Sequence, residues 1–344
     1  MTRYIEKNSD QKCREEDHWV WLGPHPIYTW PNSHFPFLCL SKSKEARIFF
    51  ISNLTHNYRW LEDYAKSFRE SDLFFVSCGW NFSKYIARQA DAMFDALGLN
   101  RSQFFVLYNS PEELANGARF GFRGEVINNN CWLEENDFSI QELPKKYDAF
   151  YLARAVEFKR HYLAAKIKRL ALAAGDKTWT ENIVELPKCL NNPHEFLSKE
   201  EISILCGRSN CGLVLSPEEG ACRASSEYLM SGTPVVSTKS SGGRDVWYNS
   251  ENSIICEDSE DAVKEAVKEA CSREWDREKI RSMHIEQAIE YRNKFKEIIE
   301  ESLNKIGCEN LSAEQVLSEN NYLKHWEQRD FTIHENRLEQ YFEK

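Results

Sequence analysis

Residues 213–245 read LVLSPEEGACRASSEYLMSGTPVVSTKSSGGRD, and this stretch decides how we interpret the fold. The apolar run LVL leads into a Glu-Gly turn, and a short stretch with helical periodicity follows. Gly232 and Pro234 end that helix, because glycine favours the position after a helix and proline cannot continue one. A second apolar run and a Gly-Gly turn follow at residues 235–243. The pattern predicts a site on loops at the carboxyl ends of parallel strands.

Strand-like and helix-like segments alternate along the chain. Apolar runs predict strands at residues 46–52, 72–77, 103–108, 125–127, 147–153, 183–186 and 253–256. Helical periodicity and end signals predict helices at residues 57–69, 83–97, 161–174, 198–208, 259–270 and 276–306. Alternation of this kind is typical of α/β proteins with parallel sheets.

The length of the chain predicts more than one domain. A chain of 344 residues exceeds what a single core usually fills. Residues 134–146 are polar with one proline, so we expect a linker near that point. We therefore expect a small N-terminal domain at residues 1–140, a second α/β domain at residues 141–310, and a helical segment or tail at residues 311–344.

Charge and cysteine content exclude some classes of protein. The net charge of −10 argues against general nucleic-acid binding, which depends on Lys and Arg neutralising phosphates. The eleven cysteines show no zinc-site spacing, and their scatter favours a reducing cytoplasm over a disulfide framework. No apolar run approaches the roughly 20 residues that span a membrane. We expect a cytoplasmic protein, and the sequence leaves peripheral membrane contact open.

Two glutamates and two cations carry a resemblance to a known family. Glu219 and Glu227 have the spacing E-x7-E, and residues 232–236 read GTPVV. Arg154 follows the apolar run that opens the second half, and Lys159 comes five residues later. In this combination the sequence resembles the C-terminal domain of retaining nucleotide-sugar glycosyltransferases of the GT-B fold, the glycosyl transferases group 1 or family 4-like enzymes.

The resemblance implies an architecture and a division of labour. It is good over residues 125–270 and vague before residue 125. A GT-B enzyme has two Rossmann-like, doubly wound parallel-sheet domains that face a cleft. The donor would bind mainly to the C-terminal domain and the acceptor mainly to the N-terminal domain.

The resemblance also assigns roles to residues of the second half. Arg154, Lys159 and Glu219 would be catalytic: the two cations would neutralise the leaving diphosphate, and Glu219 would face the donor sugar hydroxyls. Glu227 would bind the ribose hydroxyls of the donor. The other donor-binding positions lie at the turn, at the helix N-terminus and at the Gly-Gly turn, namely Gly220, Ala221, Cys222, Arg223 and Gly243.

Three of the nearby positions have two interpretations. Arg223 stands where the family usually has a small or apolar residue, and it either reaches a ligand or pairs with an acidic neighbour. Gly243 either brings its amide near phosphate or only makes a turn. Arg160 either holds phosphate or faces solvent.

The acceptor side is less defined by the sequence. Polar and aromatic residues follow the predicted strands of the first half, where their carboxyl ends would face the cleft. The candidates at these strand ends are His56, Gly79, Trp80 and Asn109. Gly79 would permit the close approach of a substrate, and Trp80 would either stack on a sugar or pack in the core.

The predicted function is a metal-independent, retaining glycosyltransferase of the hexosyltransferase type, acting in polysaccharide biosynthesis. It would move a sugar from a UDP- or GDP-linked donor to a glycan or other hydroxyl acceptor, with no cofactor and no nucleic acid. Two alternatives stay open. One is a non-catalytic nucleotide-sugar or glycan binding module of the same fold, and the other is a GT-B phosphorylase or epimerase.

Overall fold

A computed structural model describes residues 12–15, 18–21, 37–42, 47–51, 54, 61, 64–175, 184–195, 197–308 and 310–318. The chain divides into an N-terminal unit, Met1–Trp132 with Tyr291–Lys344, and a C-terminal unit, Leu133–Glu290. These boundaries differ from the expected ones after residues 140 and 310. The reason lies in helix α7 (Arg277–Lys305), which begins in one unit and ends in the other, so that the chain after residue 290 packs with the N-terminal unit.

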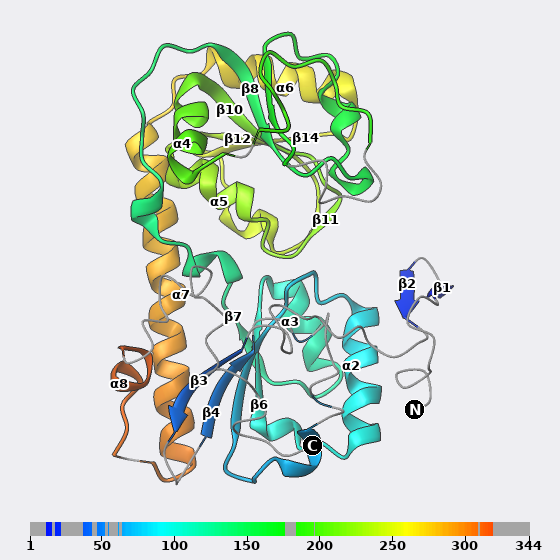
Figure 1. Ribbon diagram of the computed structural model, residues 1–344, viewed down its shortest axis with the longest axis vertical. Coiled ribbons are helices and arrows are strands. Elements are labelled where there is room, and N and C mark those ends of the chain that lie inside the picture. Colours follow the sequence, from blue (N-terminus) through cyan, green and yellow to red (C-terminus); the bar gives the residue numbers. More distant parts are fainter. Residues whose placement is uncertain are drawn as a thin grey trace. The chain divides into compact units, whose positions relative to one another are not determined.

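The N-terminal unit is built on a five-stranded sheet in the order β3-β4-β5-β6-β7 (Figure 1). Its strands, with the separate β1–β2 hairpin, are β1 (Lys12–Glu15), β2 (His18–Trp21), β3 (Phe37–Lys42), β4 (Arg47–Ile51), β5 (Leu73–Ser77), β6 (Phe104–Tyr108) and β7 (Gly124–Val126). β3 is antiparallel to β4, and the other neighbours are parallel. The strands from β4 to β7 follow one another in chain order, so this sheet has no switch point among the described strands.

Helices cover both faces of the N-terminal sheet, as Figure 1 shows for α2 and α7. The helices of this unit, besides the second half of α7, are α2 (Lys84–Leu97), α3 (Pro111–Ala118) and α8 (Ala313–Ser318), with short 3-10 turns η2 (Ala65–Ser67), η3 (Arg101–Gln103) and η4 (Asn129–Trp132). On one face Phe94 of α2 packs edge-on against Phe104, with ring centroids 4.7 Å apart. On the other face Phe295 of α7 packs against Phe75, at 5.2 Å.

The C-terminal unit is built on a second five-stranded sheet, and all its strands are parallel. The strands are β8 (Tyr147–Leu152), β9 (Leu170–Ala173), β10 (Ser209–Val214), β12 (Val235–Thr238) and β14 (Ser253–Cys256), with a small parallel pair β11 (Glu218–Glu219) and β13 (Ser241–Gly242). In the sheet order β14-β12-β10-β8-β9, β8 lies between β9, which follows it in the chain, and β10. The strand order therefore reverses between β8 and β10, where a doubly wound sheet binds its ligands.

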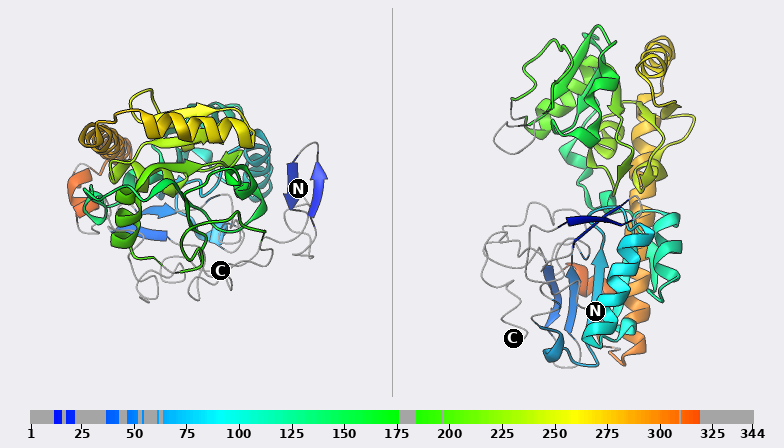
Figure 2. Two further views of the ribbon diagram at one scale, coloured as in Figure 1. Left: turned by 90° about the horizontal axis from the view of Figure 1, so that it is seen from above. Right: turned by 90° about the vertical axis from the view of Figure 1, so that its right-hand side faces the viewer.

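The faces of this second sheet are also covered. Its helices, besides the first half of α7, are α4 (Lys199–Arg208), α5 (Arg223–Met230) and α6 (Glu260–Ser272), with 3-10 turns η5 (Glu135–Asp137), η6 (Glu157–Lys159), η7 (His161–Ala164) and η9 (Arg244–Trp247). Buried residues of α6 such as Val263 and Val267 share a core with Leu213 and Val236. Figure 2 (left) shows α6 lying along that face. On the opposite face Tyr228 of α5 packs against Phe150.

Several predicted helices are confirmed with their end signals. Helix α2 begins after Ser83, whose hydroxyl accepts a bond from the Ile86 amide, and it ends at Gly98 with φ of 64°. Helix α4 begins after Ser198, which forms a capping box with Glu201. These local rules work because each bond satisfies a helix-end group that has no partner inside the helix.

Two predicted elements are wrong, and a third is described only in part. Residues 161–174 do not form a helix: they contain the short turn η7 and the strand β9. Pairing of Leu170–Ala173 with β8 and burial of all four residues outweigh the local helical preference of Leu and Ala. Residues 184–186 form no strand. Of the thirteen residues of the helix expected at 57–69, six lie outside the described residues, and Ala65–Ser67 form the 3-10 turn η2.

Candidate functional site

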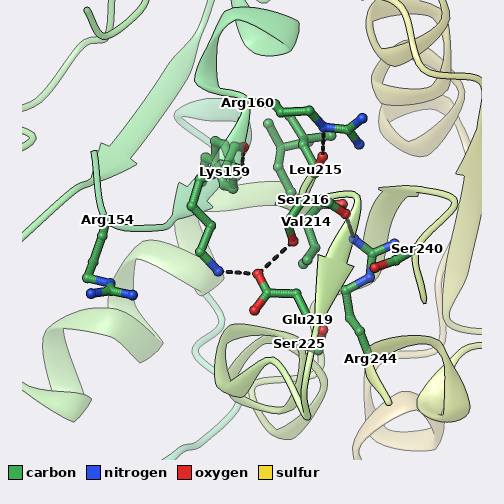
Figure 3. Close-up of polar contacts among 12 residues, drawn as sticks. Arg154, Lys159, Arg160, Val214, Leu215, Ser216, Glu219, Ser225, Ser240 and Arg244 are labelled. Atoms are coloured by element: carbon green, nitrogen blue, oxygen red, sulfur yellow. Dashed lines mark hydrogen bonds and ion pairs between the residues drawn. The ribbon is translucent and has the colours of Figure 1, made fainter. Parts of the chain in front are cut away.

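The candidate site lies at the carboxyl ends of β8, β10 and β12 in the C-terminal unit (Figure 3). Arg154 and Lys159 lie on the loop after β8, and Glu219 lies in β11 after β10. Their loops start from the two strands between which the strand order reverses. Residues 60 positions apart in sequence are thus brought into contact by the parallel pairing of β8 and β10.

Lys159 and Glu219 form the central contact. The Lys159 ammonium donates to Oε1 of Glu219, and the side chains are only 14% and 6% exposed. The Ser216 hydroxyl donates to the same oxygen at 2.6 Å. A buried charge is costly unless it is paired, so each of these two residues requires the other. Both bonds fall on Oε1, and Figure 3 draws the second carboxylate oxygen without a contact.

Arg154 provides an exposed cation beside this pair. Its guanidinium makes no hydrogen bond or ion pair with the residues that the structure describes, and Figure 3 shows the side chain running alongside that of Lys159 without a contact. The backbone of Arg154, in contrast, is held: its carbonyl oxygen lies 2.9 Å from Nε2 of the buried His161. The site therefore has one cation already paired with a carboxylate and a second that is available to a ligand.

The Arg160 side chain does not face solvent, and it bonds groups of the protein itself. Its side chain is 10% exposed and donates to the carbonyl of Leu215 at 2.5 Å and to the Thr238 hydroxyl at 2.7 Å. It also pairs with Asp258. The guanidinium thus ties the loop after β8 to the chain that follows β10, β12 and β14.

Arg244 is a structural cation that sequence reasoning did not single out. It is fully buried, and it donates to the carbonyls of Ser216 at 2.7 Å and Val214 at 3.3 Å. It also bonds the carbonyl of Thr238 and pairs with Asp245 at 2.7 Å. Carbonyls at strand ends lack sheet partners, and a buried guanidinium satisfies several of them at once. The only signal in the sequence was its place next to the Gly-Gly turn.

The Glu-Gly turn and the Gly-Gly turn are joined as the pair β11–β13. Glu219 pairs with Gly242, and the Gly243 amide donates to the Gly220 carbonyl at 2.8 Å. This pairing sets the position of Glu219 through the backbone. It also gives Gly243 a structural role, because its amide proton is used inside the protein.

Helix α5 holds Glu227 on its buried side. Glu227 is 6% exposed, and its Oε1 accepts a bond of 2.9 Å from Nε of Arg223, one turn earlier. Arg223 is half-exposed, so of its two interpretations the pairing with an acidic neighbour is the one observed. Ala221 precedes the helix on the same turn.

Backbone conformation marks the same site. Cys222, which precedes α5, and Arg160 both have left-handed backbones, with φ of 54° and 52°. They are the non-glycine residues with positive φ in the part of the chain that the structure describes. This conformation costs roughly 1–2 kcal/mol for a residue with a side chain, and such strain clusters at functional sites. Burial raises the pKa of the Cys222 thiol, so it stays protonated and packs as an apolar group.

In the N-terminal unit, Asn109 follows a strand whose polar end bonds the protein's own backbone. It is fully buried after β6, its amide nitrogen donates to the Cys78 carbonyl at 3.1 Å, and its Oδ1 accepts from the Asn129 amide at 2.9 Å. Its own amide donates to the buried carboxylate of Glu113 at 2.7 Å. The nitrogen and the oxygen of the Asn109 side chain therefore link the end of β6 to the residues that follow β5 and β7.

The other acceptor-side candidates are placed only in part. Gly79 is exposed and Trp80 is half-buried, both directly after β5. His56 lies outside the described residues. In the same unit burial raises the pKa of Glu113 to about 7, so this carboxyl takes up a proton far more readily than an exposed one.

Two further features bear on cofactors and membranes. Among the described residues no group of three or more His, Cys, Asp or Glu side chains is arranged to hold a metal ion. None of the helices in this part of the chain has the length and hydropathy to cross a membrane.

Comparison with known families identifies the C-terminal unit. Residues 134–290 match the family model described as Glycosyl transferases group 1. The match coincides with the unit Leu133–Glu290, so this unit is a group 1 glycosyltransferase domain. The predicted enzyme class, a glycosyltransferase, and the predicted α/β fold with parallel sheets in two Rossmann-like units are thereby confirmed.

Three solved structures illustrate what the chain is similar to. The Anabaena protein Alr3699/HepE in complex with UDP and glucose is 14% identical, with 66% of this chain and 71% of that chain covered and a TM-score of 0.47. Sucrose-phosphate synthase from Thermosynechococcus elongatus is 15% identical, with 65% and 64% covered and a TM-score of 0.46. The pneumococcal O-GlcNAc transferase GtfA in complex with UDP and GlcNAc is 15% identical, with 68% and 53% covered and a TM-score of 0.45.

At these identities and TM-scores the similarities do not define the activity of this chain. The chain spans less than two thirds of the synthase and about half of GtfA. No curated protein matches the chain.

Proposed function

We propose that the chain is a retaining glycosyltransferase that uses a nucleoside-diphosphate sugar, UDP- or GDP-linked, and needs no metal ion. The observation that carries this proposal is the grouping of Arg154, Lys159 and Glu219 at the point where the strand order of a glycosyltransferase domain reverses. The acceptor is a hydroxyl group of a glycan or another molecule.

The two cations suit a leaving diphosphate. When the bond between the anomeric carbon and the diphosphate breaks, negative charge develops on the departing oxygen. The exposed guanidinium of Arg154 and the ammonium of Lys159 supply positive charge from one loop, and a preorganised cation stabilises such charge without reorganising solvent. Arg154 can also bind two phosphate oxygens at once through its planar fork.

Glu219 has a second task besides pairing with Lys159. Its Oε1 accepts hydrogen bonds from Lys159 and Ser216, and its other oxygen can accept a hydrogen bond from a hydroxyl of the donor sugar. Glu227, in turn, would accept hydrogen bonds from the ribose hydroxyls once Arg223 moves away from the Glu227 carboxylate. The half-exposed Arg223 has room to do so and to reach phosphate from the start of α5.

The transfer itself would take place on one face of the sugar. The acceptor oxygen forms a bond to the anomeric carbon as the bond to the diphosphate breaks. The electron pair of that bond goes to the diphosphate, and the acceptor proton goes to one of its oxygens. No carboxylate nucleophile takes part, which fits a Glu219 that is held in an ion pair.

Calorimetry tests the donor site. The wild-type protein should bind UDP or GDP and the matching sugar nucleotide, and Arg154→Ala should weaken that binding by about 10²-fold, as expected for the loss of a charge-assisted bidentate contact. Glu227→Ala should weaken binding of both the nucleotide and the nucleoside, because it addresses the ribose. Unchanged binding in both variants would contradict the assignment of the donor site.

Product release separates an enzyme from a binding module. Incubation of the wild-type protein with UDP- and GDP-sugars, with and without chelator, should release the nucleoside diphosphate at equal rates. Binding without release, even when glycan acceptors are supplied, would favour the non-catalytic module. Release that stops with chelator would contradict the metal-free mechanism.

A further inference from the structure

We propose that Tyr151 and His161 are positioning residues that hold the two donor-site cations in place from beneath. This inference rests on the proposed function and adds two residues to it. Tyr151 lies in β8 and His161 begins η7, and both side chains are buried at 1% exposure. Both side chains bond the backbone of the loop that carries Arg154 and Lys159, so their effect would pass through that loop.

Each residue bonds the backbone of one cation. Nε2 of His161 lies 2.9 Å from the carbonyl oxygen of Arg154. The Tyr151 hydroxyl donates to the carbonyl oxygen of Lys159. The two rings also pack against each other, with centroids 4.7 Å apart and planes tilted by 41°. One pair of contacting rings therefore fixes both ends of the loop from residue 154 to residue 159.

The chemistry of the contact defines the state of His161. A carbonyl oxygen only accepts, so Nε2 carries the proton and Nδ1 does not. Nδ1 is buried and has no hydrogen-bond partner among the described residues. Burial, moreover, lowers the pKa of His161, which keeps the ring neutral. A neutral ring with one tautomer makes a single, directed bond, and it adds no charge that would compete with Arg154 or Lys159 for phosphate.

The loop between these two bonds needs such fixing. Arg160, its next residue, has the left-handed conformation and is tied by its side chain to the Leu215 carbonyl and the Thr238 hydroxyl. The Arg154 guanidinium is exposed and has no partner in the described chain. Its direction therefore depends on the backbone beneath it, and binding by a loose arginine would cost additional conformational entropy.

Phenylalanine variants of His161 and Tyr151 separate their hydrogen bonds from the contact between their rings. His161→Phe keeps a ring against Tyr151 and removes the bond to Arg154, and Tyr151→Phe keeps the ring and removes the bond to Lys159. We expect each variant to bind the preferred nucleoside diphosphate, UDP or GDP, about tenfold more weakly. Binding of the matching nucleoside, uridine or guanosine, should be unchanged, because the two cations address only the phosphates.

A conservative variant and a double variant complete the test. His161→Gln can return an N–H to the Arg154 carbonyl and should recover part of the lost affinity. In the background of Arg154→Ala, His161→Phe should cause no further loss, because it acts through Arg154. Equal weakening of nucleoside and diphosphate, or a full additional loss in the double variant, would overturn the inference and leave a general structural role.

The two proposals fail in different ways. If Arg154→Ala binds the nucleoside diphosphate as the wild type does, the donor-site assignment itself fails. If Arg154→Ala loses binding while His161→Phe and Tyr151→Phe bind normally, only the positioning role is refuted. Thermal unfolding of each variant should be measured in parallel, so that affinities are compared between folded proteins.

Discussion

The carboxyl edges of the two sheets carry polar residues for different purposes. In the C-terminal unit the edge holds Lys159 and Glu219 in an ion pair, with the exposed Arg154 nearby. In the N-terminal unit the edge holds Asn109 and Glu113, which are fully buried and bond mainly the backbone. A polar residue with a free or exchangeable charge can serve a ligand, whereas one that is surrounded by its own backbone serves the fold.

The difference has an electrostatic cause. An amide can be buried at small cost if both of its ends find partners, as those of Asn109 do. A buried ionisable group is either paired with its opposite charge, as Glu219 is with Lys159, or shifted toward its neutral form, as Glu113 is by its raised pKa. The two sheets also differ in strand order. The order reverses between β8 and β10 in the C-terminal sheet, whereas β4 to β7 of the N-terminal sheet follow one another in chain order.

The largest effect is expected at the ion pair of the C-terminal edge. Lys159→Ala should lower the rate of sugar transfer or donor hydrolysis by at least about 10²–10³-fold, the loss typical of one charge-stabilising group. It should also destabilise the unit by about 3–5 kcal/mol, because it leaves the buried Glu219 without its partner. Transfer is measured by nucleoside diphosphate release and stability by denaturant unfolding.

Two further variants make the Lys159 result interpretable. Lys159→Ala combined with Glu219→Gln removes the unpaired charge, so it should regain stability and remain inactive. Lys166→Ala deletes an exposed lysine of the same unit, which pairs with Asp261, and should leave both quantities near wild type. Activity that returns in the double variant would show that Lys159 matters only for folding.

A large effect on stability alone is expected at the N-terminal edge. Asn109→Ala leaves the Cys78 carbonyl and the Asn129 amide without a partner, at a cost of about 3–4 kcal/mol in the free energy of unfolding. The control Asn100→Ala removes an exposed asparagine that caps a short turn and should cost about 1 kcal/mol.

The same Asn109 variant sharpens the comparison between the edges. Nucleotide affinity, measured by calorimetry below the melting temperature, should match that of the wild type. A stable Asn109→Ala protein that has lost only acceptor-dependent transfer would show instead that this residue contacts the acceptor.

The smallest effect is expected from the pH dependence of Glu113. Its pKa is raised from the ordinary value of 4.5 to about 7, mainly by burial. Between these values the folded protein binds a proton that the unfolded chain does not, so stability falls as the pH rises from 4.5 to about 7 and then levels off. The shift corresponds to at most about 3 kcal/mol.

Glu113→Gln should remove this slope. Denaturant unfolding at pH 5, 6, 7 and 8 should show a smaller decline in the variant than in the wild type. Glu112→Gln, which changes the exposed neighbour on the same turn of α3, should keep most of the wild-type slope, because burial is the main cause of the raised pKa and the charge of Glu112 a lesser one. Parallel curves for Glu113→Gln and the wild type would mean that Glu113 is ionised throughout.

Some of the fold follows from local rules that act within a few residues. The caps of α2 and α4 were predictable because Ser83, Gly98 and Ser198 interact with groups in their own helix turn. Residues 161–174 were not predictable in this way. Their apolar residues suit a helix as well as a strand, and pairing with β8 decides between the two.

The sequence by itself predicted the enzyme class, through a family resemblance, and proposed Arg154, Lys159, Glu219 and Glu227 as site residues, because the spacing of motif residues is a property of the chain. Only the tertiary structure decided what each side chain does. It paired Lys159 with Glu219, buried Arg160 and Arg244 as ties between strand ends, and joined Asn109 to its neighbours. Those roles depend on which carbonyls and charges meet across parallel strands, and residues far apart in the sequence become partners only when the sheet forms.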